Sequence, residues 1–164
     1  MKRLSYALLL LTPFIYTSPV FQSFPSILRG YLPVAAIFIF FRLRMKWGVA
    51  FAFASALVMD AAVAAAIGPY VLLHGLFIGA AFLWRRLVPH PSPMATGVAV
   101  GLTSAVAELV FFILMMILGW HISMVNSYEF FTVPLSTGIY AGLMSHWFLR
   151  DITDYRVLER DSNA

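Results

Sequence analysis

The sequence contains no cysteine and has little charge. Only 11% of its 164 residues are charged, whereas 62% are hydrophobic. An ordinary soluble domain has about 25% charged and about 45–50% apolar residues, so this composition excludes a water-soluble globular protein. The absence of cysteine excludes disulfides, thiolate catalysis and cysteine-based metal sites. Lipid is therefore the expected surrounding of most of the chain.

Sequence motifs of catalysis are also missing. The chain has no GxSxG elbow, HExxH helix, P-loop or GxGxxG. A shared metal site is not expected, because the topology below scatters the histidines over both sides of the membrane. These are His74, His90, His121 and His146. We expect no cofactor and no metal. Asp60 and Glu108 could in principle act as acid and base, but without a nucleophile or metal the non-enzyme reading is favoured.

Hydropathy predicts an all-α bundle of six transmembrane helices in a single domain, with both termini cytoplasmic. The predicted spans are about 4–20, 24–41, 47–66, 70–84, 94–119 and 134–149, followed by a short cytoplasmic tail, 150–164. The first stretch could be a secretory signal, but Pro13, Pro19 and the lack of a clear cleavage site favour an uncleaved helix. The second stretch is long enough to span a membrane only if it extends back to about Phe24. Otherwise the first two segments form shallow, broken helices.

The basic residues support this topology. Arg29 falls on the outer side, and every other lysine and arginine falls on the inner side, as the positive-inside rule predicts. The inner set is Lys2, Arg3, Arg42, Arg44, Lys46, Arg85, Arg86, Arg150, Arg156 and Arg160. These residues are therefore topology anchors at helix ends, and the net charge of +4 does not indicate nucleic-acid binding. The polar segment 120–133 is the outer loop long enough to present a surface.

Small residues recur at helical spacing and predict close helix packing, which has to supply most of the association energy in lipid. Three GxxxG pairs and one stripe stand out: Gly75 and Gly79, Gly97 and Gly101, Gly138 and Gly142, and Gly48 with Ala52 and Ala56. We expect the Gly75 and Gly79 pair to pack inside the bundle, because the short turn at Gly68 forces its helix against the preceding one. Gly138 and Gly142, on the last span, are freer to face a partner's single helix.

Two acids lie within predicted spans, which is costly in lipid. Asp60 continues the stripe that begins at Gly48, and Glu108 continues the face of Gly97, so both are expected to point inward. Each either hydrogen-bonds to its surroundings and fixes helix register, or belongs to a polar pocket or partner contact. The hairpin between spans three and four could also bring Asp60 close to His74 near the outer surface.

The stretch WGVAFAFASALVMDAAVAAAIGPYVLLHGLFIGAAFLWRRL resembles the rod shape-determining MreD family. That family's pattern is a glycine-started helix over small residues, a late aspartate, a glycine at the turn and an apolar helix that ends in basic residues. The matching positions are Gly48, Asp60, Gly68, Gly79, Arg85 and Arg86. The resemblance covers about 40 residues of the chain, and elsewhere only length and topology are similar.

The resemblance implies a non-enzymatic, multi-pass scaffold of the bacterial cell-elongation and peptidoglycan-synthesis complex in the inner membrane. Its implied partners are the bitopic protein MreC and, more loosely, MreB, RodA and a class B penicillin-binding protein. The family is also distantly similar to the S-components of energy-coupling-factor transporters. That similarity gives the alternative of a substrate-binding subunit, in which Asp60, His74 and Glu108 would line a small-molecule site.

Overall fold

The chain forms helices because its long apolar segments can satisfy their backbone hydrogen bonds internally only in a helix. The computed structural model describes residues 2–63, 68–88, 92–117 and 127–161, and every regular element in these ranges is helical. The elements are α1 Lys2–Thr17, α2 Pro19–Gln22, the short 3-10 helix η1 Ser26–Leu28, α3 Leu32–Leu43, α4 Met45–Val63, α5 Pro69–Leu87, α6 Pro93–Ile117 and α7 Ser127–Asp161.

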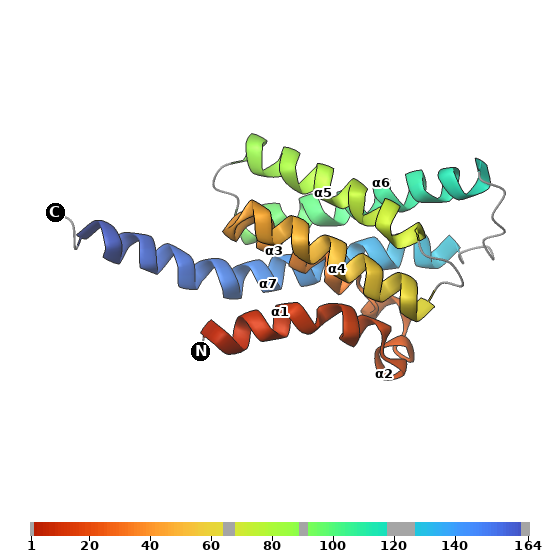
Figure 1. Ribbon diagram of the computed structural model, residues 1–164, viewed down its shortest axis with the longest axis horizontal. Coiled ribbons are helices and arrows are strands. Elements are labelled where there is room, and N and C mark those ends of the chain that lie inside the picture. The colour runs from red at the N-terminus through yellow and green to blue at the C-terminus, as the bar shows by residue number, and fades with distance from the viewer. Residues whose placement is uncertain (1, 64–67, 89–91, 118–126, 162–164) are drawn as a thin grey trace.

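The long helices run along one axis, and the start of α1 and the end of α7 lie at the same end of the molecule (Figure 1). Two arginines link the helices at this end. Arg85 donates from Nη1 to the carbonyl oxygen of Phe41 at 2.9 Å, and Arg42 donates from Nη1 to the carbonyl oxygen of Val88 at 3.2 Å. The ends of α3 and α5 therefore meet where the basic residues gather, as the predicted charge distribution requires. We call this the basic end of the bundle.

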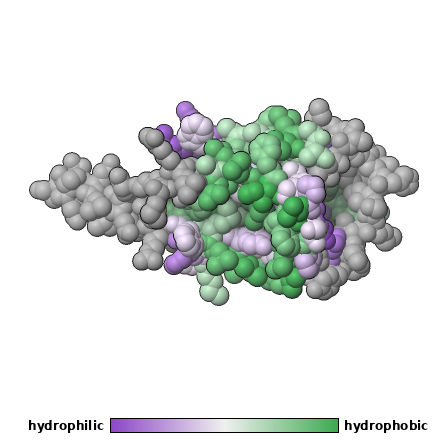
Figure 2. Space-filling view, turned by 90° about the horizontal axis from the view of Figure 1, so that it is seen from below, coloured by the Kyte–Doolittle hydropathy of each residue, from purple (hydrophilic) through white to green (hydrophobic). Residues whose placement is uncertain are grey.

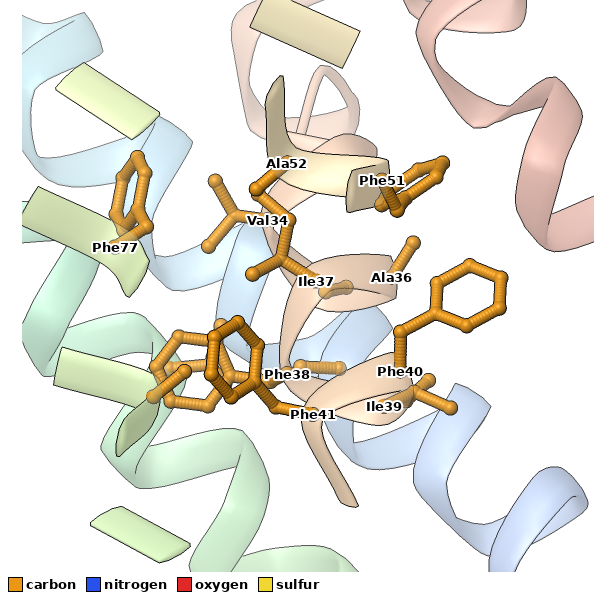
Figure 3. Packing of buried hydrophobic residues seen from close by; sticks show 14 of the residues in the cluster. Val34, Ala36, Ile37, Phe38, Ile39, Phe40, Phe41, Phe51, Ala52 and Phe77 are labelled. Carbon is orange, nitrogen blue, oxygen red and sulfur yellow. The ribbon is translucent and has the colours of Figure 1, made fainter. Parts of the chain in front are cut away.

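The short apolar helix α3 is almost entirely buried. All residues from Pro33 to Phe41 are buried, and the side chains of α3 pack on several sides, against Phe51 of α4 and Phe77 of α5 among others (Figure 3). At 12 residues, α3 is only about 18 Å long, against about 30 Å for a hydrocarbon core. A short helix is tolerated here because protein, rather than lipid, surrounds it.

The prediction of one continuous helix over 24–41 is wrong. Residues 24–31 form only η1 and irregular structure, so the alternative of broken helices holds for this part of the chain. The segment is held by α7: Thr137 Oγ1 accepts from the backbone N–H of Tyr31 at 2.7 Å, and Tyr140 donates to the carbonyl oxygen of Leu28 at 2.8 Å. These bonds satisfy backbone groups that a helix would have satisfied locally.

The surface of the bundle is typical of a membrane protein. Within the described residues, three helices are long and apolar enough to cross a membrane, over Met45–Ala62, Pro69–Leu87 and Pro93–Leu114, and shorter apolar helices cover Ala7–Thr17 and Leu32–Leu43. On the face in Figure 2, hydrophobic residues gather in the middle of the long axis and hydrophilic ones lie toward both ends. This arrangement matches an apolar belt between two polar boundaries.

The last helix is longer than predicted. We expected a span over 134–149, an outer loop over 120–133 and a tail after 149, but α7 runs from Ser127 to Asp161. The part of the predicted loop from 120 to 126 lies outside the described residues. Polarity marks where a chain leaves lipid and not where a helix ends, since a helix can continue into water with solvated side chains. The helix therefore extends beyond the predicted span at both ends, and the bounds of the span stay a prediction.

Candidate functional site

The closest helix contact in the bundle joins α6 and α7 through the predicted glycine pairs. A Cβ atom built on Gly97 would lie 2.7 Å from the carbonyl oxygen of Gly138, and one built on Gly138 would lie 2.7 Å from that of Gly97. A Cβ on Gly101 would lie 3.2 Å from the carbonyl oxygen of Pro134, and one on Gly142 3.4 Å from that of Pro93. The two backbones therefore touch, which is what small residues permit.

Two of the glycine pairs do not pack where the sequence predicted. Gly75 and Gly79 have no neighbouring atom within 4 Å of a built Cβ, so the prediction that they pack inside the bundle is wrong. Gly138 and Gly142, which we expected to face a partner's helix, pack against α6 instead, and only the outer side of this contact is open. Gly75 and Gly79 lack neighbours because α5 is rotated so that other residues form its buried side. These residues are Leu73, His74, Phe77 and Ala81.

Two further glycines of the resembling stretch act at helix ends. A Cβ on Gly48 would collide with the ring of Phe41, so this glycine lets α4 begin close against α3. Gly68 has no packing contact at its Cβ position, but its φ of 140° is one that other residues rarely adopt. Its role in the structure is to turn the backbone before α5.

Asp60 joins α4 to the beginning of α5. Its side chain is 1% exposed, and its two oxygens accept from the backbone N–H groups of Gly68 and Tyr70, both at 2.9 Å. Gly68 is the N-cap residue and has no side chain with which to cap, while Pro69 has no N–H to satisfy. The carboxylate therefore caps α5 from another helix, where the helix dipole also favours a negative charge.

Asp60 and His74 are linked through the backbone of Tyr70 and not by direct contact of their side chains. His74 Nδ1 lies 2.8 Å from the carbonyl oxygen of Tyr70, and Asp60 accepts from the N–H of the same residue. No direct hydrogen bond between the two side chains is found among the described residues. His74 is 1% exposed, and its ring packs edge-on against Tyr31 at a centroid distance of 5.8 Å. It is thus part of the buried aromatic packing behind Tyr31.

A cavity of about 490 Å³ opens at the end of the bundle opposite the basic end. It lies between the end of α1, the residue before α3, the start of α5, the second half of α6 and the start of α7. Its walls are aromatic with a few polar groups. The lining residues are Tyr16, Tyr31, Tyr70, Leu73, Glu108, Leu109, Phe111, Phe112, Glu129, Phe130, Phe131 and Val133. Of the three expected site residues, Glu108 alone lines this cavity.

The two carboxylates of the cavity have different partners. Glu129 accepts from Arg29 Nη2 at 2.7 Å and forms an ion pair with it. Glu108 has only a long contact with the hydroxyl of Ser104, at 3.4 Å, and forms no ion pair within the described part of the chain. Since Asp60 and His74 do not reach the cavity, Glu108 is the candidate for contact with a ligand.

Sequence reasoning missed the tyrosines of this site. Tyr16 and Tyr31 pack edge-on with ring centroids 4.8 Å apart, and the hydroxyl of Tyr31 is buried without a hydrogen-bond partner in the described structure. Both tyrosines and Tyr70 fall in the half of the bundle away from the basic end. This shared position is the only feature of the sequence that could have pointed to a common site. No cluster of metal-ligating side chains occurs among the described residues.

A second hollow is an apolar groove of about 700 Å³ on the outside of the contact between α6 and α7. Its floor contains the four glycines of that contact. Its rims are exposed apolar side chains, with Met94, Val98 and Leu102 on α6 and Leu135, Ile139 and Leu143 on α7. His146 lies at one end of the groove. We refer to it as the α6–α7 groove.

Comparison with protein-family models, curated proteins and solved structures finds no match to the chain.

Proposed function

We propose that this chain is a non-enzymatic scaffold of the bacterial cell-elongation complex, similar to MreD, with six crossings of the inner membrane and both termini in the cytoplasm. The resembling stretch supports this proposal because three of its marked residues join one helix of the bundle to another. Gly48 seats α4 against Phe41, Asp60 caps α5, and Arg85 ties the end of α5 to α3. Such residues maintain a shape, which is what a scaffold requires.

The α6–α7 groove is the observation that carries the proposal. A scaffold must offer a surface to partners inside the membrane, and a transmembrane helix associates by close packing against small residues. The groove has a glycine floor and exposed apolar rims along two helices. We propose that the single transmembrane helix of an MreC-like protein packs into it, with MreB, RodA and a class B penicillin-binding protein joining the same complex.

The test places a bulky side chain on the rim without entering the glycine contact. Leu102 on α6 is 65% exposed and lines the groove, whereas Leu83 on α5 is 54% exposed and does not. We expect Leu102→Trp to reduce co-purification of the MreC-like protein from native membranes at least about tenfold, a loss that 1.4 kcal/mol of binding energy would produce. Leu83→Trp should retain the partner.

Both variants keep the helix contacts intact, so both should accumulate as folded protein. Equal recovery of the partner with Leu102→Trp and with the parent chain would refute the groove as the docking surface. Absence of any elongation-complex protein in the parent purification would refute the scaffold proposal itself.

The alternative is the S-component of an energy-coupling-factor transporter. The aromatic cavity favours it, because a site of about 490 Å³ with few polar groups has the size and character of a small-molecule pocket. The same purification distinguishes the two functions. Recovery of an ATPase pair with its membrane coupling subunit would replace the scaffold proposal by the transporter one.

A further inference from the structure

The aromatic cavity is lined by a set of groups that points to one class of ligand. Its walls carry three tyrosines and four phenylalanines, and its charged lining residues are Glu108 and Glu129. The only basic side chain paired with either carboxylate in the described structure is Arg29, on Glu129. Two carboxylates against one guanidinium leave the cavity with an excess of negative charge when both are ionised.

Glu108 is the carboxyl group of the cavity that has no cationic partner in the described part of the chain. It lies on α6 in an apolar stretch, and its long contact with Ser104 is the only hydrogen bond that it forms to the described residues. A carboxylate away from water is costly unless it is paired with a cation or hydrogen-bonded. A positive charge placed in the cavity would supply the partner that the described part of the chain does not.

The aromatic walls complement the same charge. Ring faces of tyrosine and phenylalanine attract cations, and the attraction is strongest where water is excluded. Tyr31 packs edge-on against Tyr16 and is fixed from behind by His74, so these rings are held in place before any ligand arrives.

We propose that this cavity binds an organic ammonium ion with an apolar body, whose charge pairs with Glu108 and whose body contacts the aromatic walls. The ammonium group belongs either to a free cation or to an amine-bearing lipid headgroup. The proposal does not depend on the scaffold role, because the cavity and the α6–α7 groove share no lining residue.

The test compares a cation with its uncharged isostere on the intact chain in dodecyl maltoside, a detergent without ammonium groups. The probes are meta-hydroxyphenyl-trimethylammonium and meta-tert-butylphenol, with binding measured by calorimetry. We expect the cation to bind at least about tenfold more tightly than the isostere. Equal affinity for the two probes would overturn the proposal.

Variants then test which residue pairs with the charge of the bound cation. Glu108→Gln keeps the shape of the side chain and should remove most of the preference for the cation. Lys46→Gln, at the exposed basic end, should bind the cation as the parent does. A Glu108→Gln protein that retains the full preference would overturn the role of Glu108.

A measurement on the parent chain covers the case in which Glu108→Gln does not fold. Dicyclohexylcarbodiimide modifies carboxyl groups in apolar surroundings, and mass spectrometry locates the product. The cation should protect Glu108 from modification, and the isostere should not. Modification of Glu108 at an unchanged rate in saturating cation would overturn the proposal.

The source of the ammonium group is decided in nanodiscs. One set contains phosphatidylglycerol alone, and the other contains equal parts of phosphatidylglycerol and phosphatidylethanolamine. Weaker binding of the cation in the second set, absent in Glu108→Gln, assigns the site to the lipid headgroup. Equal binding in both sets assigns it to a free cation. Leu102→Trp should bind the cation as the parent does, so failure of the docking proposal would not affect this one.

Discussion

Removal of the Asp60 carboxylate should destabilise the bundle through the start of α5. In Asp60→Leu, the N–H groups of Gly68 and Tyr70 lose the acceptors that they now have at 2.9 Å. A buried donor left without an acceptor costs about 1–3 kcal/mol. Because both hydrogen bonds are only partly buried, the substitution should cost about 2 kcal/mol of unfolding free energy in total. Asp60→Asn keeps one acceptor oxygen and should cost about half as much.

Insertion into the membrane should not be impaired by either variant. A carboxylate at membrane depth costs at least about 2.5–3.5 kcal/mol on insertion scales, and leucine removes that cost. We therefore expect normal amounts of inserted Asp60→Leu protein with reduced resistance to denaturation. Any loss of partner binding or of rod shape should accompany this loss of stability, because Asp60 is buried and faces the backbone of α5.

The assay is unfolding of the purified protein by sodium dodecyl sulfate, followed by circular dichroism, together with amide hydrogen exchange. Exchange at Gly68 and Tyr70 should accelerate in both variants, and more in Asp60→Leu. Glu108→Gln is the matched control, since it removes a carboxylate from a helix without removing a backbone acceptor. A leucine variant no less stable than the asparagine variant, or unchanged exchange at these two amides, would refute the capping role.

Three further outcomes follow from the contacts described above. Gly138→Val should greatly reduce the yield of folded protein, because a Cβ there lies 2.7 Å from a facing carbonyl oxygen, while Gly79→Val should fold normally in detergent; similar yields would contradict the packing. Glu129→Gln, which breaks a partly exposed ion pair with Arg29, should change unfolding free energy by at most about 1 kcal/mol, and a larger loss would show a structural role. A reporter fused within 121–131 should read external and one at the carboxyl terminus cytoplasmic; a cytoplasmic signal from the first would overturn the six-span topology.

The apolar composition and the placement of basic residues determined the class of structure. They predicted an all-helical bundle, the order of its long helices and the gathering of arginines at one end, because lipid requires backbone bonds to close within each helix. The helical period also placed Asp60 on the buried side of α4 with Ala52 and Ala56. These features depend on single segments and on their boundaries with water.

Tertiary structure alone decided which helix faces meet. In lipid, apolar faces gain little by contacting one another, so pairing depends on the fit of two surfaces. The sequence offered three similar glycine pairs, and only the packing of α6 on α7 and the rotation of α5 distinguished Gly138 from Gly79. For the same reason the short α3 could not be recognised as the centre of the bundle. Tyr31 and Glu108 became parts of one cavity only when five elements met at one end.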